Sequence, residues 1–519
     1  MKKLIALTLV TVMLFALCAC GDTGTASGDV SYDIPEGKQI PDDAVLDITI
    51  TSHASWPYEE NWKVWEYIRE AIGGTLNITA VPASDFATKF PLIMAASDQF
   101  PDVIYGAGRQ KGFADYCEQG AFVALEDYKE FLPDYYAFWE SLPEKDQWMR
   151  EIRKGADGKT YATPVYGMER YTNLRTWLYR KDVFDKHGLE VPETTEELYT
   201  VSKKLKELYP ESYPFCIRQG LTNMNVIGST WKPNFHYNVY YDFENKKWSY
   251  GATESEIMLE MVEFFRKMVA EKLVPADFFN INAASWQELV STNRGFIMPE
   301  YQVRIDFFNN IARANMPEFN LTAMTPPRAE NGFGINKNNK YNQDPATYVV
   351  CNTGDKAGIA NSMRFINWLY SDEGCELLSW GKEGETYEVV DGKRKYIVEN
   401  EGDTAQVLYG FKTHGTYMRI DPECIDASIS EEQAATTDFI IDNIYPNLDP
   451  TLYIQFSGED SKLISDYKTS LETYVTENIQ KFIIGQRDIA EWDVFQTELL
   501  EMPIAELLAV YEKAYDRAR

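Results

Sequence analysis

Hydrophobic and polar residues are arranged along the chain in a pattern that predicts strands followed by helices. Val45 to Ile50 alternates with a period of two, as a strand does, and apolar residues from Glu59 to Ile72 recur at helical spacing before Gly73-Gly74. Short connections between strand and helix favour parallel pairing, so we expect an α/β sheet. The same order continues with a strand at 76–81, a helix at 85–96 and a strand at 102–105.

The remainder of the chain mixes both kinds of element and ends almost entirely in helices. Thr194 and Glu197 have the spacing of a capping box, which predicts the start of a helix that runs to Leu208. Asp391-Gly392 predicts a hairpin turn. The further predictions are a strand at 177–179, helices at 181–187 and 254–272, a hairpin within 237–251, and helices at 461–484, 490–500 and 503–517.

The first residues have the pattern of a secretion signal. A positive start at Met1-Lys2-Lys3 precedes the apolar run Leu4 to Leu17, which is too short to span a bilayer comfortably. Ala19 before Cys20 resembles a bacterial lipobox, in which the cysteine becomes the new N-terminus and carries a diacylglyceryl group. We therefore expect a signal peptide at 1–19, lipidation of Cys20, and a tether at 20–45. A plain secretory signal is the alternative.

Charge and residue counts exclude several classes of function. With 50 basic and 80 acidic residues the formal net charge is -30, so nucleic acid and anionic membrane surfaces are poor partners. The aromatic share of 14% exceeds what a core needs and suggests a stacking surface. The four histidines show no metal-ligand spacing and the cysteines no CxxC pair, so we expect neither a metal nor a cofactor, and free thiols. No catalytic motif is present, although so many acids leave a glycosidase pair open.

Segments spread over nearly the whole chain resemble a known family. In this order, behind a lipobox, they are similar to family 1 extracellular solute-binding proteins of bacterial ABC importers, and most to the large lipoprotein branch of Gram-positive bacteria. The segments are Phe100–Tyr105, Asp157–Pro164, Leu178–Pro192, Phe365–Gly374, Trp380–Tyr387, Phe482–Gly485, Trp492-Asp493 and Ala514–Arg517.

The resemblance implies a two-lobed α/β fold of the periplasmic-binding-protein-like kind (type II), with a hinge and a helical C-terminal region. Carried onto this chain, lobe one is 46–165 plus 330–400, and lobe two is 166–329 plus 401–519. The resemblance further implies a monomeric receptor rather than an enzyme. It would be anchored by its lipid to the outer face of the cytoplasmic membrane, and would deliver a small solute to the transmembrane subunits of an ABC permease.

An oligosaccharide is the ligand we expect, held by aromatic rings packed on sugar C–H faces and by polar side chains that satisfy hydroxyls. Open α/β sheets place ligands on loops after strands, which directs attention to aromatic and polar residues at those positions. Each of them has an ordinary structural alternative, such as a packed ring, a turn glycine or a solvated acid. The candidates are Trp56, Tyr58, Tyr105, Gly106, Arg109, Tyr166, Trp231, Glu300, Tyr301, Trp380 and Glu383.

Other tryptophans and other classes of function are alternatives to these candidates. Trp62, Trp65 and Trp286 sit at helical spacing, which favours a place in the core. A peptide or another small polar solute is a second ligand class. A cell-surface polysaccharide hydrolase and an adhesin or surface structural protein are functions of different classes. The sequence leaves these alternatives open.

Overall fold

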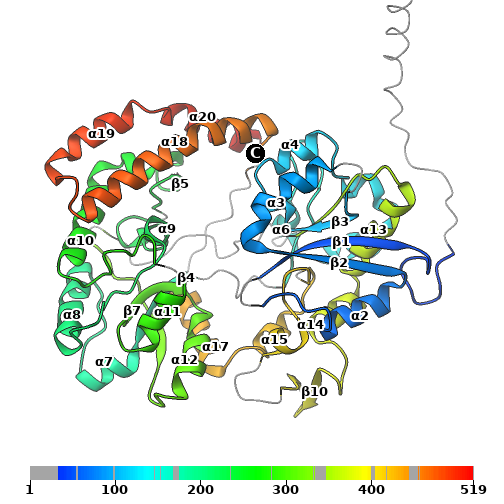
Figure 1. The fold of residues 1–519 in the computed structure, drawn as a ribbon, viewed down its shortest axis with the longest axis horizontal. Helices are drawn as coiled ribbons and strands as arrows, with labels where there is room; N and C mark the ends of the chain where they lie inside the picture. The colour runs from blue at the N-terminus through cyan, green and yellow to red at the C-terminus, as the bar shows by residue number, and fades with distance from the viewer. Residues whose placement is uncertain are drawn as a thin grey trace, which may run out of the picture.

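The protein forms two lobes that lie side by side in the computed structural model (Figure 1). The signal, Cys20 and the first part of the tether lie outside the described residues. No helix among those residues combines the length and the apolarity needed to cross a bilayer. The residues described are 33–53, 56–96, 100–144, 147–151, 153–167, 175–233, 235–281, 283–330, 332, 347–398, 404–416, 418–443, 454 and 456–517.

Lobe one is built on a four-stranded sheet with the order β2-β1-β3-β9. The strands are β1 (Val45–Ser52), β2 (Thr75–Pro82), β3 (Val103–Tyr105) and β9 (Tyr348–Val350). β1 pairs in parallel with β2 and β3, as the alternation of elements predicts, while β9 returns from far along the chain and pairs antiparallel with β3. Because a long insertion separates β3 from β9, the local sequence pattern does not predict this antiparallel edge strand.

Helices cover both faces of this sheet because its strands are apolar on both sides. Leu46 and Ile48 of β1 pack in one core with α2 and α13, while Ile104 of β3 packs in a second core with Phe86 of α3. A small hairpin of β10 (Tyr387–Val390) and β11 (Lys393–Tyr396) lies at the edge of the lobe (Figure 1). The helices are α2 (Lys63–Ile72), α3 (Ala83–Ala95), α4 (Phe113–Glu118), α5 (Pro133–Ser141), α6 (Trp148–Glu151), α13 (Lys356–Trp368), α14 (Asp372–Ser379), α15 (Ala405–Tyr409) and α16 (Pro422–Asp426).

Lobe two contains a smaller sheet with the order β7-β4-β8. Its strands are β4 (Arg175–Arg180), β7 (Ile297–Tyr301) and β8 (Leu321–Met324), and both pairings are antiparallel. Trp177 packs on one face of the sheet and Leu178 on the other, so this sheet too is covered twice. The predicted hairpin forms separately from β5 (Val239–Asp242) and β6 (Lys247–Tyr250).

The helices of lobe two include the C-terminal group that the sequence predicts. The predicted capping box of Thr194 and Glu197 starts α8, and Gly485, with a φ of 77°, follows α18. At its start α18 reaches lobe one, where Gly458 N donates to Glu118 Oε1 over 2.7 Å. The helices are α7 (Lys181–His187), α8 (Thr195–Leu208), α9 (Gly220–Val226), α10 (Ser255–Ala270), α11 (Ala283–Ser291), α12 (Arg304–Arg313), α17 (Glu431–Asn443), α18 (Gly458–Ile483), α19 (Trp492–Leu500) and α20 (Ile504–Arg517).

The described residues change from one lobe's core to the other's more than once along the chain. These changes fall between Val165 and Trp177, between Ala329 and Tyr348, and between Ile429 and Ile440. The last change comes later than the boundary at 400 and 401 expected from the sequence, because Phe411 and Ile420 pack in the core of lobe one. An amphipathic pattern shows that a segment has an apolar face, but not which of two cores receives it.

Candidate ligand-binding site

Aromatic rings lie at the edge of lobe one where β1 ends. β1 and β3 run in parallel, so the loops that follow them emerge at the same edge of the sheet. In the loop after β1 the indole of Trp56 stacks on the imidazole of His53, with ring centroids 4.5 Å apart and planes 24° from parallel. Tyr58 N donates to Ser52 Oγ over 2.9 Å and ties the loop to the strand end. The partly buried Trp56 thus forms part of the surface at this edge.

His414 joins the same surface from a distant part of the chain. Its Nδ1 is 2.8 Å from the hydroxyl of Thr51, its ring meets His53 edge-on at 5.3 Å, and it lies 5.7 Å from the ring of Tyr105. Burial, with smaller contributions from His53 and Arg109, lowers the pKa of His414 to about 4. The imidazole is therefore neutral at pH 7 and offers hydrogen bonds without a charge.

The loop after β3 turns at Gly106 and brings Arg109 towards the two histidines. Gly106 has a φ of 101°, and a Cβ on it would lie 2.8 Å from Cγ2 of Thr51, so the backbone here is both left-handed and closely packed. Arg109, at the end of the short helix η2 (Ala107–Arg109), contributes to lowering the pKa of both His53 and His414. Tyr105 itself is buried beneath this surface, 1% exposed.

Glu300 of lobe two is held in a buried ion pair. The sequence places Glu300 and Tyr301 after a short strand, whereas the structure includes both in β7. Glu300 Oε2 accepts from Arg218 Nε over 2.7 Å and lies 2.6 Å from Nη2, and the two side chains are 1% and 8% exposed. The Arg218 guanidinium also lies over the ring of Trp286, 5.0 Å from its centroid. Charge pairing and stacking together fix both groups in place.

Tyr301 and Arg304 extend this polar surface at the end of β7. Arg175 on the neighbouring strand faces Tyr301, donates to its hydroxyl over 2.7 Å, and has its guanidinium carbon 4.1 Å from the ring centroid. Arg304 begins α12, and its Nε is buried with no hydrogen-bond partner among the described residues. Burial lowers the pKa of Arg304, and Glu300 opposes that change. The guanidinium nevertheless stays charged at any physiological pH.

The two surfaces lie close enough for a charge on one lobe to act on the other. The pKa of His53 is lowered first by burial and then by Arg304 of lobe two and Arg109 of lobe one. Arg304 therefore lies near enough to act on an imidazole of the opposite lobe. The edge that carries Trp56 in lobe one and the edge that carries Tyr301 and Arg304 in lobe two thus belong to one region between the lobes, which we call the facing surface.

Two tryptophans proposed from the sequence lie in the cores. Trp231, 5% exposed, packs against Phe264 and Phe265 in lobe two. Trp380, 1% exposed, stacks on Tyr396 and donates from Nε1 to Asp421 over 2.7 Å in lobe one. Core packing accounts for both rings, and the structure does not bring either of them to the facing surface.

Three further candidates lie apart from that surface or at its margin. The hydroxyl of Tyr58 donates to Glu60 over 2.7 Å, and its ring packs edge-on against Trp65. The ring of Tyr166 lies edge-on to Phe138 at 5.1 Å, just before the first change of lobe. Glu383 is exposed beside β10, in the outer hairpin region of lobe one. Trp62, Trp65 and Trp286, predicted as core residues, are indeed buried.

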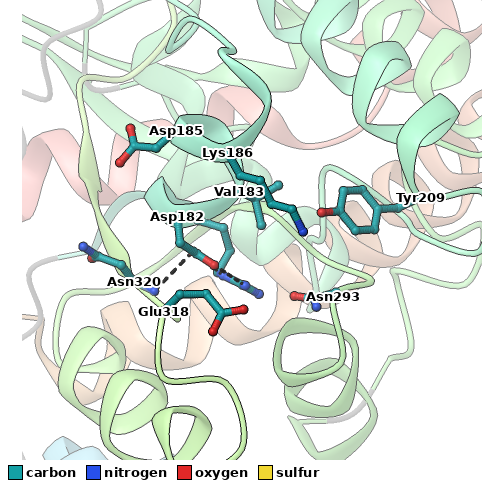
Figure 2. A pocket seen from close by; sticks show the side chains of 9 residues that line it. Asp182, Val183, Asp185, Lys186, Tyr209, Asn293, Glu318 and Asn320 are labelled. Carbon is teal, nitrogen blue, oxygen red and sulfur yellow. Dashed lines mark hydrogen bonds and ion pairs between the residues drawn. The ribbon is translucent and has the colours of Figure 1, made fainter.

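Two cavities open elsewhere in the part of the chain that the structure describes. A cavity of about 550 Å³ opens beside α7 of lobe two, where Lys186 and Tyr209 extend along one side and Asp182 lies opposite (Figure 2). Asp182 is bound there by Arg180 and by the backbone N of Asn320. A second cavity of about 240 Å³ lies beside α4 in lobe one. Neither cavity contains a residue proposed from the sequence as a ligand contact.

Several residues of the facing surface were missed from the sequence. His53 lies in the loop after the predicted strand Val45 to Ile50, the same loop that contains Trp56, so its position is a usable signal. Arg304 lies three residues beyond Tyr301, which the sequence places after a short strand, so the same signal points to it. His414 gave no signal, because its contact with Thr51 spans 363 residues of sequence.

The chain crosses between the two lobes several times, and polar and aromatic side chains lie between them. This architecture is typical of two-lobed solute-binding proteins. The comparisons with known proteins agree. The chain belongs to the bacterial extracellular solute-binding protein family, whose model matches residues 64–374.

Two curated relatives support this membership. Lipoprotein LipO of Bacillus subtilis is 26% identical over 362 residues, covering 64% of this chain and 66% of LipO. The fructooligosaccharide ABC transporter substrate-binding protein FusA of Streptococcus pneumoniae is 20% identical over an alignment of 98% of this chain and 97% of FusA. The coarse function of this chain is therefore that of an extracellular solute-binding protein, and the relative FusA is by name the substrate-binding protein of an ABC transporter.

Solved structures show the same fold. FusA of S. pneumoniae in complex with kestose superimposes with a TM-score of 0.75 at 17% identity, covering 91% of this chain and 99% of that one. The alginate-binding protein AlgQ2 without calcium ion superimposes with a TM-score of 0.74 at 21% identity, covering 93% and 99%. At these identities the likeness supports the two-lobed α/β fold predicted from the resemblance.

Proposed function

We propose that this protein is the lipid-anchored substrate-binding protein of an ABC importer and that it captures an oligosaccharide between its lobes. The observation that carries this proposal is the partly buried Trp56, whose ring stacks on His53 of lobe one, the imidazole on which Arg304 of lobe two acts electrostatically. FusA and the N-glycan transport protein NgtS of S. pneumoniae are named for a fructooligosaccharide and for N-glycans, which supports the ligand class.

Stacking and hydrogen bonding would divide between the lobes. The indole of Trp56 offers an apolar face to sugar C–H groups, while Tyr301, Arg175 and the neutral His414 offer donors and acceptors to hydroxyls. A ligand that contacts both lobes binds the closed state more tightly than the open one. About 5.5 kcal/mol of such differential binding moves a mostly open population to a mostly closed one.

The anchor and the partner follow from the same proposal. Cys20 would carry the diacylglyceryl group and hold the body, through the tether 20–45, at the outer face of the cytoplasmic membrane. The loaded monomer would then deliver the sugar to the permease. Mass spectrometry of protein purified from membranes tests the anchor: the expected N-terminal peptide starts at lipidated Cys20, whereas an unmodified N-terminus would contradict it.

Calorimetry with two ligand panels tests the function. Short neutral and acidic oligosaccharides form one panel, and peptides of similar length form the other. We expect heat of binding from members of the glycan panel and a more compact particle in small-angle scattering when a bound glycan is present. Binding to peptides alone would replace the sugar with a peptide ligand, and release of shorter sugars from a labelled glycan would indicate a hydrolase.

A further inference from the structure

Guanidinium groups from both lobes gather around the facing surface. Arg109 comes from lobe one, and Arg175, Arg218 and Arg304 come from lobe two. Arg304 links the set, since it acts electrostatically on His53 and is itself influenced by Glu300, Arg218 and Tyr301. The region is therefore one electrostatic neighbourhood rather than four separate surface arginines.

Glu300 neutralises only part of this charge. It forms the buried pair with Arg218, whose geometry leaves both groups occupied by each other. Asp306, two residues beyond Arg304, accepts hydrogen bonds from Ser430 N and Oγ and so is bound to the segment before α17. Glu300 is therefore committed to Arg218, and Asp306 to Ser430, so neither carboxylate forms an ion pair with Arg304 among the described residues.

Among these four arginines, Arg304 is the one whose hydrogen-bonding capacity most clearly calls for a ligand. Its side chain is partly buried, and its Nε has no hydrogen-bond partner among the described residues. The guanidinium carbon lies 5.1 Å from the ring centroid of Phe307, a contact that orients the side chain without neutralising it. Burying part of a charge without an anionic partner is unfavourable, and a bidentate carboxylate is the partner that a guanidinium fits best.

We propose that the oligosaccharide this protein captures is acidic, and that Arg304 binds a carboxylate of one of its sugar residues. The proposal rests on the proposed function and adds the chemical class of the substrate. In it, Trp56 of lobe one stacks on a sugar ring while Arg304 of lobe two binds the charged substituent, so that only a sugar carrying an anion engages both lobes fully.

Matched pairs of glycans test the substrate class. Calorimetry compares trigalacturonate with its methyl ester, and sialyllactose with lactose; within each pair the uncharged member lacks the free carboxylate. A charge-assisted hydrogen bond predicts that an acidic member binds roughly 10- to 100-fold more tightly than its neutral counterpart, and that added salt reduces this difference. A sulfated disaccharide in the same panel distinguishes a carboxylate site from a general anion site.

Arg304→Gln identifies the residue, with Arg313→Gln as the matched control. Arg313 lies on the same helix and pairs with Glu432 at the other end of α12. We expect Arg304→Gln to remove most of the preference for the acidic member while thermal unfolding shows an intact fold, and Arg313→Gln to leave that preference unchanged.

The outcomes separate this inference from the proposed function. Tight binding of neutral oligosaccharides with no gain from a carboxylate, or a preference that Arg304→Gln does not alter, would overturn the inference and leave the oligosaccharide function standing. A sulfated sugar preferred over carboxylates would overturn the carboxylate assignment. Binding of peptides and of no glycan would overturn both.

Discussion

The two lobes present different chemistry to the same region. Lobe one contributes rings, with Trp56 stacked on His53 and His414 held at Thr51. Lobe two contributes charge, with Arg218 paired to Glu300 and Arg304 beside them. The imidazole of His414 is neutral at pH 7, so Arg109 is the charged side chain among the residues named here for lobe one.

This difference indicates how closure would be coupled to ligand identity. Rings bind any sugar with an accessible C–H face and discriminate weakly, whereas a desolvated guanidinium discriminates strongly between charged and neutral groups. A ligand that satisfies only lobe one would leave the lobes unlinked. Mutating the residues of each lobe separately is the direct way to measure what each lobe contributes.

The largest expected effect comes from breaking the buried pair in lobe two. Glu300→Gln leaves Arg218 buried without a countercharge, which should lower the free energy of unfolding by about 3–5 kcal/mol. Urea denaturation measures it. Glu207→Gln is the control, because the exposed pair of Lys204 and Glu207 contributes little. Equal losses of unfolding free energy in the two variants would show that the effect of Glu300→Gln does not come from burial of the ion pair.

Two partly buried histidines, one in each lobe, should make the stability of the protein depend on pH. Burial lowers the pKa of His414 in lobe one, and that of His236 in lobe two, from 6.5 to about 4. Between these values the unfolded chain binds a proton that the folded protein does not. Stability is therefore complete above pH 6.5 and falls as the pH drops towards 4, by about 2–3 kcal/mol at pH 4.5 for each histidine.

Substitution by glutamine checks this sign in each lobe. His414→Gln should remove the contribution from lobe one while an amide can still meet Thr51, and His236→Gln should remove that from lobe two. Unfolding free energies measured between pH 7 and 4.5 should then fall less steeply than in the wild type. An unchanged slope in either variant would contradict a lowered pKa for that histidine.

Substitution of Gly106 measures how closely the atoms are packed at the edge of lobe one. Gly106→Ala places a Cβ in a left-handed conformation and 2.8 Å from Cγ2 of Thr51, which should cost about 2–3 kcal/mol of stability and disturb the Thr51–His414 contact. Gly120→Ala, also left-handed but with no atom within 4 Å, should cost only about 1 kcal/mol. The difference between the two losses of stability measures the steric crowding of the added Cβ against Thr51. Equal losses in thermal unfolding would show that this crowding is absent.

The smallest effect, and the sharpest test of the ring surface, is on affinity. Trp56→Ala should weaken oligosaccharide binding by about 1–2 kcal/mol, roughly 5- to 30-fold, with little loss of stability. Trp231→Phe should do the reverse, because that ring lies in the core of lobe two. If calorimetry showed that Trp231→Phe weakens binding and Trp56→Ala does not, the position of the ring surface would be wrong.

Much of the fold could be predicted because it depends on local patterns. The parallel pairing of β1 with β2 and β3, the capping box of α8, the β5–β6 hairpin and the C-terminal helices all follow from spacing along the chain. Which residues contact the ligand stays a prediction. The structure brings Trp56, Arg109 and Tyr301 to the facing surface, but it buries Glu300 in the pair with Arg218 and packs the ring of Trp231 in the core of lobe two.

Sequence by itself determined the elements of each lobe and the family, because periodicity, caps and turns are encoded over a few neighbouring residues. Only the tertiary structure decided which residues meet between the lobes. Thr51 and His414 are 363 residues apart, and His53 and Arg304 belong to different lobes. Such contacts depend on where the chain changes lobe and on which core receives each apolar face, and no local pattern of residues records either choice.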